Sequence, residues 1–456
     1  MKKSILLTVL CFLFFLGTSL LSHGSGFLIY EHGAAAMGMG GAFVALANNP
    51  TAIFHNPAGI AWLEGTQISF GTTLIRPQNS LSLSNWPDPT YQNVDGESQW
   101  FYPSSFYISH KINDRIAAGF GFFSPYGLGT KWPKDYPLKY IAYSDDMATF
   151  FFNPTLAYKV NENFSVGIGV SYVYATIDFK LVELEALDVG PLIPMPFSIL
   201  ALVDIPVALE ASGSGWGLNA GALYRGDNFS IGFNWRGGFE IDFEGDLDLE
   251  NPQVQILPPY DQMIPAGPVA QAMAQILPNE GKASTSFKFP HILGVGAAFN
   301  LSESLILSAD IHYILWSSFD KYVVNVDVPI AVSGFEFKDK EVNEDWEDSF
   351  IFRGGIQYLV NESLALRAGI LYDQTPQPVE SMDPVLPDAA RWGFTGGIGY
   401  STGNFSIDVA YQYELFDERT SPNRNIPIYM VSGMNLGEGT YSAKAHLFGI
   451  SLGFRL

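Results

Sequence analysis

Large apolar residues alternate with small or polar ones along much of the chain, and this period limits what it can fold into. In residues 164–174, aromatic and β-branched residues alternate with Ser, Gly and one Val, and similar patterns occur at 229–235 and 405–415. A period of two places successive side chains on opposite faces of a β-strand. In a soluble β-sandwich the apolar face would meet a second sheet. The opposite face here is Gly, Ser and Ala with scattered charges, which is typical of a barrel lumen.

The first 24 residues predict a secretory signal peptide. Two lysines precede a short apolar run at 5–16, and Ser22-His23-Gly24 provides small residues for cleavage, expected after Gly24. The alternative, a membrane anchor, is disfavoured because the run is short for a spanning helix. The only cysteine, Cys11, follows a leucine, which disfavours lipidation. The mature chain then has neither a disulfide framework nor a thiol site.

The composition favours a membrane barrel and excludes a nucleic-acid partner. Hydrophobic residues make up 47% of the chain, aromatic residues 14% and charged residues only 15%. Beyond the signal no apolar run is long enough for a spanning helix, so an exported chain of this kind indicates a transmembrane β-barrel. Without Lys2 and Lys3 the 24 basic residues become 22, against 46 acidic ones, a net charge of −24. Nucleic-acid binding needs clustered cations instead.

Short polar turns divide the chain into hairpins and predict the number of strands. Six such turns lie at residues 113–114, 161–163, 226–228, 302–304, 361–363 and 402–404. Six hairpins supply twelve strands, and an opening strand near 66–78 and a closing strand near 442–456 make fourteen. An even number suits a barrel with both ends on the periplasmic side. The longer connections, expected outside the cell, are 79–100, 125–148, 180–214, 245–284, 321–348, 375–390 and 418–441.

Two of these long connections are unusually apolar, at residues 189–211 and 254–277. Exposed connections are normally polar, so an apolar one indicates a covered or binding surface. One interpretation is an apolar surface that captures a hydrophobic ligand. The other is that the two connections pack on each other as a lid.

A stretch rich in small residues, 33–59, differs from everything that follows it. It is Gly- and Ala-rich, almost uncharged, and carries turn signals at Asn49-Pro50 and Asn56-Pro57-Ala58-Gly59. Such a run can pack tightly inside another structure but builds no core by itself. We therefore expect a plug threaded into the barrel, the alternative being an N-terminal helix on a soluble domain. The expected organisation is a signal peptide at 1–24, a hatch at 25–65 and an all-β, 14-stranded transmembrane antiparallel barrel at 66–456.

Taken together, these motifs resemble the FadL/TodX family of outer-membrane transporters for long-chain fatty acids and other hydrophobic compounds. The resemblance extends over nearly the whole mature chain and rests on Gly26-Phe27, the stretch 47–59, the segments 102–130 and 151–175, WSSFDK at 316–321, and RAGILYDQTPQP and LPDAARW between 367 and 392. It implies a 14-stranded barrel closed by a hatch, capture of ligand between outer loops, and sideways release through the wall. Two departures are Trp392 directly after Arg391, and an end at Leu456 where an aromatic residue is usual.

The resemblance also implies roles for particular residues. Asn56, Pro57 and Ala58 match the hatch motif, and Phe27 matches an apolar residue that enters the ligand pocket. The inward kink of the third strand, and with it the lateral opening, falls at four residues, Ser124, Pro125, Tyr126 and Gly127. Pro125 also lacks an N–H and Gly127 allows unusual dihedral angles, so this stretch can break a ladder. The alternative is that Pro125 merely ends a strand at the rim.

Three arginines, Arg225, Arg353 and Arg367, lie on the inward phase of their strands and are candidates for binding a ligand carboxylate. The alternative is a lumen salt network with inward acidic residues. No P-loop, nucleophile elbow or metal-ligand spacing of histidines occurs, so we expect no enzyme, cofactor or metal.

The expected partners are a long-chain fatty acid or another hydrophobic molecule, outer-membrane lipid and lipopolysaccharide, and the barrel assembly machinery. The expected state is a monomer in the outer membrane of a Gram-negative-type bacterium. The alternatives are an aromatic-hydrocarbon channel of the same fold, a structural or adhesive barrel and, in principle, a barrel hydrolase whose catalytic residues meet only in space.

Overall fold

The structure, a computed structural model, describes residues 26–84, 86–193, 197–328, 337–421 and 438–456. The predicted signal peptide and its cleavage after Gly24 lie outside the described residues. The strands are β1 (Thr66–Ser82), β2 (Asn93–Asp95), β3 (Ser104–Lys111), β4 (Ile116–Phe123), β5 (Gly127–Lys131), β6 (Ser144–Lys159), β7 (Phe164–Asp188), β8 (Leu200–Arg225), β9 (Phe229–Arg236), β10 (Phe239–Leu249), β11 (Gln253–Ile256), β12 (Glu280–Phe289), β13 (Ile292–Asn300), β14 (Leu305–Ile314), β15 (Lys321–Asp327), β16 (Lys340–Asn343), β17 (Ser349–Leu359), β18 (Leu364–Asp373), β19 (Arg391–Thr402), β20 (Phe405–Phe416), β21 (Arg419–Ser421) and β22 (Gly439–Arg455).

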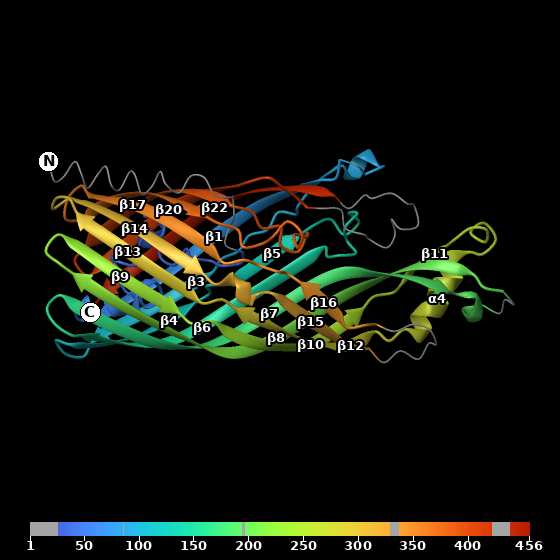
Figure 1. Ribbon diagram of the computed structural model, residues 1–456, viewed down its shortest axis with the longest axis horizontal. Helices are drawn as coiled ribbons and strands as arrows, with labels where there is room; N and C mark the ends of the chain where they lie inside the picture. The colour runs from blue at the N-terminus through green and yellow to red at the C-terminus, as the bar shows by residue number, and fades with distance from the viewer. Residues whose placement is uncertain (1–25, 85, 194–196, 329–336, 422–437) are drawn as a thin grey trace.

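These strands close into one antiparallel barrel (Figure 1). Six wall strands are interrupted, and each consists of two labelled segments: β4 with β5, β9 with β10, β12 with β13, β14 with β15, β16 with β17 and β20 with β21. The short segments β2 and β11 lie at the margin, where β2 pairs with β1 and β11 pairs with β8. The circuit then has fourteen strands, and β22 returns to pair with β1 from Gln67–Arg455 to Ser82–Thr440. All six predicted hairpins are present. The predicted barrel is confirmed.

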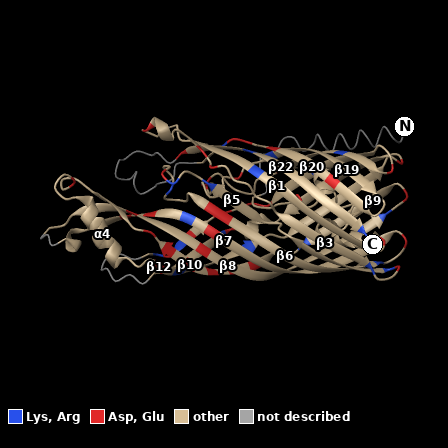
Figure 2. Cartoon of the chain, turned by 180° about the vertical axis from the view of Figure 1, so that it is seen from behind, with Lys and Arg blue, Asp and Glu red and all other residues tan. Residues whose placement is uncertain are grey.

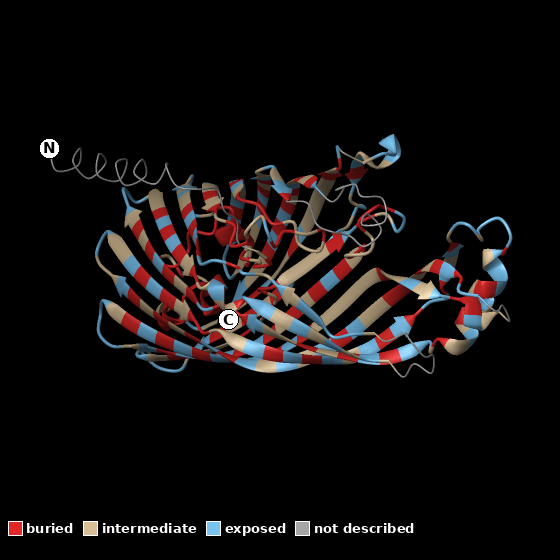
Figure 3. Ribbon diagram, turned by 45° about the vertical axis from the view of Figure 1, so that its right-hand side comes forward, coloured by how far each residue is buried: buried red, intermediate tan, exposed pale blue. Residues whose placement is uncertain are grey.

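Buried and exposed residues alternate along the wall strands, as expected of a barrel whose outer face meets lipid. On β7, Ser165 and Ser171 face inward and are buried, whereas Ile168 faces outward and is 59% exposed. The stripes of buried and exposed residues in Figure 3 repeat this pattern around the wall. Large apolar side chains therefore cover the outside, where they meet lipid, and small residues leave room in the lumen.

The segment before β1 occupies that room. The helices and 3-10 turns are α2 (Ala34–Met37), α3 (Ala52–His55), η1 (Pro57–Trp62), η2 (Pro89–Tyr91), η3 (Gly190–Leu192), α4 (Ala266–Ile276) and η4 (Trp316–Ser318). In the hatch, α2 contacts β19, β20 and β22, whereas η1 contacts β6, β7 and β8 across the lumen. Nearly all hatch residues are buried, because small side chains let its backbone approach the wall. Within the described ranges, no helix is long and apolar enough to cross a membrane.

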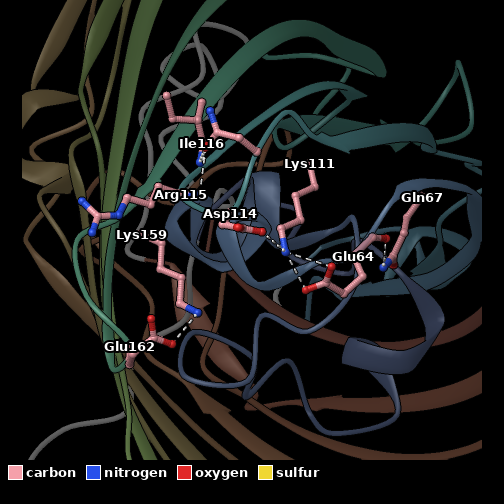
Figure 4. Close-up of polar contacts among 9 residues, drawn as sticks. Glu64, Gln67, Lys111, Asp114, Arg115, Ile116, Lys159 and Glu162 are labelled. Atoms are coloured by element: carbon pink, nitrogen blue, oxygen red, sulfur yellow. Dashed lines mark hydrogen bonds and ion pairs between the residues drawn. The ribbon is translucent and has the colours of Figure 1, made fainter.

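Ion pairs lie at the short-turn end of the barrel, and one of them, Lys111 with Glu64, joins the end of the hatch to the wall (Figure 4). The Lys111 ammonium lies 2.9 Å from the Glu64 carboxylate and 3.6 Å from Asp114. On the next hairpin, Lys159 and Glu162 pair at 3.2 Å. These pairs are largely exposed and therefore add little stability, and the Lys111–Glu64 pair mainly sets the position of the chain where it enters β1.

The wall strands extend much further than predicted on the long-connection side. The expected loop at 180–214 is mostly sheet, because β7 and β8 stay paired from Phe164–Tyr224 to Asp188–Leu200. That prediction is wrong because β8 has β7 on one edge and β10 and β11 on the other, so its backbone hydrogen bonds are satisfied along the extension. In Figure 1 this extension and α4 lie at the end away from the short turns.

The two apolar connections pack on each other, the second of the two interpretations drawn from the sequence. Ile199, beside β8, and Val269, in α4, are fully buried in one cluster. The ring of Phe197 stacks on Tyr260 with centroids 5.0 Å apart. A role of this end in ligand capture stays a prediction.

Candidate functional site

The wall is interrupted at the predicted lateral opening. The β3–β4 ladder ends at Phe106–Phe122, and the next backbone bond between these two stretches runs from the Glu97 N–H to the Lys131 carbonyl at 2.7 Å. Between these points, no backbone hydrogen bond joins the two stretches within the described chain. Pro125 lies within this break and has no N–H to donate to a neighbouring strand.

The hatch fills this break with its first described residues. The Ile29 N–H donates to the Pro125 carbonyl at 2.7 Å, and the Gly127 N–H donates to the Phe27 carbonyl at 3.0 Å. Leu28 and Tyr126 form the antiparallel bridge between them. Residues 27–29 therefore act as a short strand that covers the break from inside.

A cavity of ≈ 750 Å³ lies at this break and joins the two faces of the wall. On the lumen side it is lined by Phe27, Tyr126, Met147, Thr149 and Leu447, and on the outer side by Tyr102, Phe122, Ala148 and Phe150. Met147 and Ala148 are neighbours on β6, so their side chains point to opposite faces of the wall. Met147 is buried and Ala148 is partly exposed. The cavity thus reaches from beside the hatch to the lipid-facing surface.

Phe27 lies at the inner end of this cavity. It is buried, and its ring is surrounded by five aromatic rings, with centroids at 4.8 Å for Trp316, 5.5 Å for Phe319, 5.6 Å for Trp346, 6.0 Å for Phe289 and 6.1 Å for Tyr126. Edge contacts of this kind add about 0.5–1.5 kcal/mol per pair beyond burial. The side chain matched to a pocket by resemblance therefore sits in an aromatic cage.

The hatch motif is fastened to the opposite wall. The Asn56 side-chain amide donates to the Val44 carbonyl at 2.9 Å and to the Ala222 carbonyl on β8 at 3.1 Å. Its oxygen accepts from the Ala58 N–H at 3.2 Å. Pro57 starts η1, where a missing N–H costs nothing. The close approach is possible because the facing wall residue is Gly221, whose missing Cβ would meet the Asn56 amide oxygen.

The three predicted arginines lie outside the lining of this cavity. Arg225 donates to the Leu46 carbonyl at 3.0 Å, and Arg353 donates to the Gly40 carbonyl at 3.1 Å, so both contact the hatch backbone. Arg367 pairs with Asp408 at 2.6 Å. Their assignment to a ligand carboxylate stays a prediction, and these contacts instead favour the alternative of a structural network.

Several polar residues of the site were missed in the sequence. Arg391 lines the cavity and pairs with Asp373 at 2.8 Å. Asp310 on β14 accepts from the Phe43 and Val44 N–H groups at 2.6 and 2.8 Å. The signal was present, since a charge on the inward phase of an alternating strand needs a partner in the lumen.

Three histidines that are far apart in sequence come together around the hatch. The Tyr30 hydroxyl lies 2.7 Å from the His312 ring nitrogen, and the His55 ring nitrogen lies 2.9 Å from the His32 carbonyl. Among the described residues, no group of His, Cys, Asp and Glu could hold a metal ion. The contacts join the hatch to itself and to β14.

Asp388 holds the start of the hatch from the long-connection end. Its carboxylate accepts from the Gly26 N–H at 3.3 Å and from the Thr375 hydroxyl. Burial is the largest effect on this carboxyl and raises its pKa to about 6, against the lowering effects of the Thr375 hydrogen bond and of Arg391. The protonated form is therefore favoured in the folded state.

A pH dependence of stability follows from this carboxyl. Its folded-state pKa lies above the unfolded value, so its contribution is full below pH ~4 and is lost as the pH rises through about 6. We expect Asp388→Asn, which resembles the protonated form, to flatten the dependence and to be more stable than wild type at pH ~8, by at most ~3 kcal/mol for a shift of ~2 pKa units. Thermal melting in detergent across this pH range measures it, and parallel curves for the two proteins would contradict it.

Comparisons with known proteins agree with this architecture. The family model for outer membrane protein transport proteins (OMPP1/FadL/TodX) matches residues 16–456. The chain is 25% identical over 405 residues to the long-chain fatty acid transport protein of Salmonella typhi, which covers 85% of this chain and 87% of the relative. It is also 24% identical over 435 residues to a putative outer membrane protein of Neisseria meningitidis, over 91% of this chain and 90% of the relative.

Solved structures show the same fold. A FadL homologue of Pseudomonas aeruginosa superimposes with a TM-score of 0.74 at 20% identity, over 94% of this chain and 99% of the other. The toluene transporter TodX of Pseudomonas putida superimposes with a TM-score of 0.68 at 17% identity, over 95% and 100%. The family match over nearly the whole chain confirms the predicted resemblance and places the protein in the outer membrane as a transporter and not an enzyme. The chain belongs to the OMPP1/FadL/TodX family of outer membrane transport proteins.

Proposed function

We propose that this transporter takes up long-chain fatty acids, or hydrophobic molecules of similar size, and releases them sideways into the outer membrane. The observation that carries the proposal is the cavity at the wall break, whose lining comes from both faces of the barrel. Its volume of ≈ 750 Å³ is within the ~300–1,000 Å³ of typical ligand pockets. In this proposal the ligand enters from the long-connection end of the barrel, where an apolar surface captures it.

The sideways route follows from the energetics of an apolar chain. Burial of each methylene is worth ~0.8 kcal/mol, so a long chain gains on the order of ten kcal/mol in an apolar site. A route through the lumen would return that chain to water and lose this energy. A route through the wall passes the chain from one apolar environment to another, so uptake can proceed without an energy source.

The hatch residues 27–29 are the gate in this proposal. A ligand that enters the aromatic cage competes with the Phe27 ring, and loss of Phe27 from the cage draws the short strand away from Pro125 and Gly127. Two backbone hydrogen bonds hold that strand in place, each worth about 1 kcal/mol net. This barrier is small enough for ligand binding to overcome.

Arg391 is the residue that we assign to a fatty-acid head group. It is a cation on the cavity lining that is already paired with Asp373, so a ligand carboxylate would share or replace that pair at the guanidinium. A second candidate ligand is an aromatic hydrocarbon. The observation that favours it is the aromatic cage around Phe27, and a relative of the same fold is described as a toluene transporter.

Blocking the outer mouth of the cavity tests the proposal. Ala148 is small, partly exposed and on the outer side of the cavity, so Ala148→Trp should obstruct the mouth. We expect the variant to bind a fluorescent long-chain fatty acid in detergent with nearly wild-type affinity but to deliver it poorly to cells. The matched control is Ala297→Trp on β13, in phase with the outward-facing Val295.

The outcomes separate the candidate functions. Normal delivery by Ala148→Trp with a folded, heat-modifiable barrel would contradict sideways release at this break. Displacement of the bound fatty acid by toluene, with higher affinity for toluene, would favour the aromatic-hydrocarbon channel. The absence of binding to either ligand would leave a structural or adhesive barrel.

A further inference from the structure

A second pocket, of ≈ 430 Å³, lies on the outer surface of the barrel where β22 closes on β1. Its lining includes Arg76, Gln78 and Ser80 from β1 and Ser442 and Lys444 from β22. On these strands the even-numbered residues face outward, in phase with the exposed Leu74 and Phe448. The pocket adjoins the cavity at the wall break, with which it shares Lys444 and three neighbouring residues, but Arg76, Gln78, Ser80 and Ser442 line this pocket alone.

The pocket sits where the apolar belt of the barrel ends. Leu74 and Phe448 face each other across the two strands and are 41% and 46% exposed. The next outward pair is Arg76 with His446, followed by Gln78 with Lys444 and Ser80 with Ser442. From one outward-facing residue pair to the next, the outer surface therefore changes from apolar to basic, and then to hydroxyl-bearing. In Figure 2 the ribbon near the β1 and β22 labels is mostly tan, with a blue segment toward the loop end.

The two cations of the pocket are available to an anion. Arg76 and Lys444 are diagonal neighbours across the strand pair, a spacing within reach of long side chains. Within the described residues, neither forms an ion pair, and the Arg76 Nε–H is buried without a hydrogen-bond partner. Arg76 instead lies over the Trp100 ring, 5.6 Å from its centroid, which holds the guanidinium against the wall.

We propose that this pocket binds the phosphate group of a phosphorylated glycolipid of the outer leaflet. The loop end of an outer-membrane barrel faces outward, so the end of its apolar belt lies at the level of outer-leaflet head groups. A phosphate there meets two cations, the Gln78 amide and the hydroxyls of Ser80 and Ser442, while the acyl chains lie along Leu74 and Phe448. The lipopolysaccharide partner expected from the sequence thereby gains a site.

One carboxylate, Asp95, also lines the pocket. Its removal should change lipid binding in the opposite direction to removal of the cations. Asp95 repels a phosphate, so Asp95→Asn should strengthen lipid binding, whereas Arg76→Gln and Lys444→Gln should weaken it. A decrease on removal of Asp95 would contradict direct contact between phosphate and cations, since it would require a bridging metal ion.

Native mass spectrometry of the full-length barrel in detergent measures the binding. The probes are lipid A with both phosphates, dephosphorylated lipid A and inorganic phosphate. We expect preference for the phosphorylated lipid, and a loss of about fivefold for each cation removed, the size expected of one surface cation facing an anionic lipid. The matched control is Lys134→Gln, another exposed cation at the loop end, paired with Glu250 at 3.0 Å.

Heat-modifiable migration confirms that each variant is folded. Equal binding of dephosphorylated lipid A, or unchanged binding by the double variant Arg76→Gln/Lys444→Gln, would overturn the proposal. Displacement of the lipid by an equal concentration of inorganic phosphate would also overturn it, because the site would then select a free anion and not a lipid.

Discussion

A disulfide between positions 28 and 126 should stop uptake until it is reduced. Leu28 and Tyr126 face each other without direct hydrogen bonds, flanked by the bonds from Ile29 to Pro125 and from Gly127 to Phe27. In such pairs the Cα atoms lie ~4.5 Å apart, within the ~4.4–6.8 Å that a disulfide spans. The double variant Leu28→Cys/Tyr126→Cys would tie the gate to the wall. We expect uptake of a labelled long-chain fatty acid to fall to the level of cells without the transporter.

The same variant in reductant is the control. Cys11 lies in the predicted signal peptide, so the mature chain offers no competing thiol. Reduction should restore uptake to the level of the single variants Leu28→Cys and Tyr126→Cys, which separates the effect of the link from the effect of the substitutions. Full uptake by the oxidised form, with the disulfide verified by mass spectrometry, would show that ligand leaves by another route, such as the lumen past a displaced hatch.

Adding two methyl groups to the wall should unseat the hatch motif. In Gly221→Ala the new Cβ meets the Asn56 amide oxygen, and in Gly167→Ala it lies 2.6 Å from the Ala58 nitrogen. Asn56 cannot then keep its bonds to Ala222 and Ala58. Loss of two hydrogen bonds of about 1 kcal/mol each raises the population of unseated hatch roughly thirtyfold. We expect a barrel that still migrates as folded but takes up little ligand.

Limited proteolysis of the hatch in detergent measures this unseating directly. The matched control is Gly354→Ala, because the nearest atom to its new Cβ is the Ile370 Cγ2 at 3.7 Å, an ordinary contact. A double variant that resists protease and transports as well as this control would show that the motif is not needed to seat the hatch.

The order of strands around the barrel could be predicted from the sequence because each sequence signal for a strand or a turn is local. Alternation along a strand, a polar turn and the pairing of neighbours all depend on residues close in sequence. The turns therefore located all six hairpins, and the opening and closing strands were found where predicted. The Gly- and Ala-rich run predicted a plug for the same reason, since it cannot form a core by itself.

The upper edge of the wall could not be predicted in this way. Beyond the bilayer the alternation weakens, and β7 and β8 continue only because each finds a partner there. The apolar stretches at 189–211 and 254–277 were ambiguous between capture surface and lid, and only their contact in space showed that they cover each other.

Sequence alone determined the fold class and the strand order, because periodicity and turn chemistry act over a few residues. The tertiary structure decided what fills the break, what surrounds Phe27 and which lumen charges are already paired. Arg225 and Arg353 have the inward phase expected of ligand residues, yet they bind hatch carbonyls, and Arg391 lines the cavity. Such partners are hundreds of residues apart, and only the closure of the barrel around its own N-terminal segment brings them together.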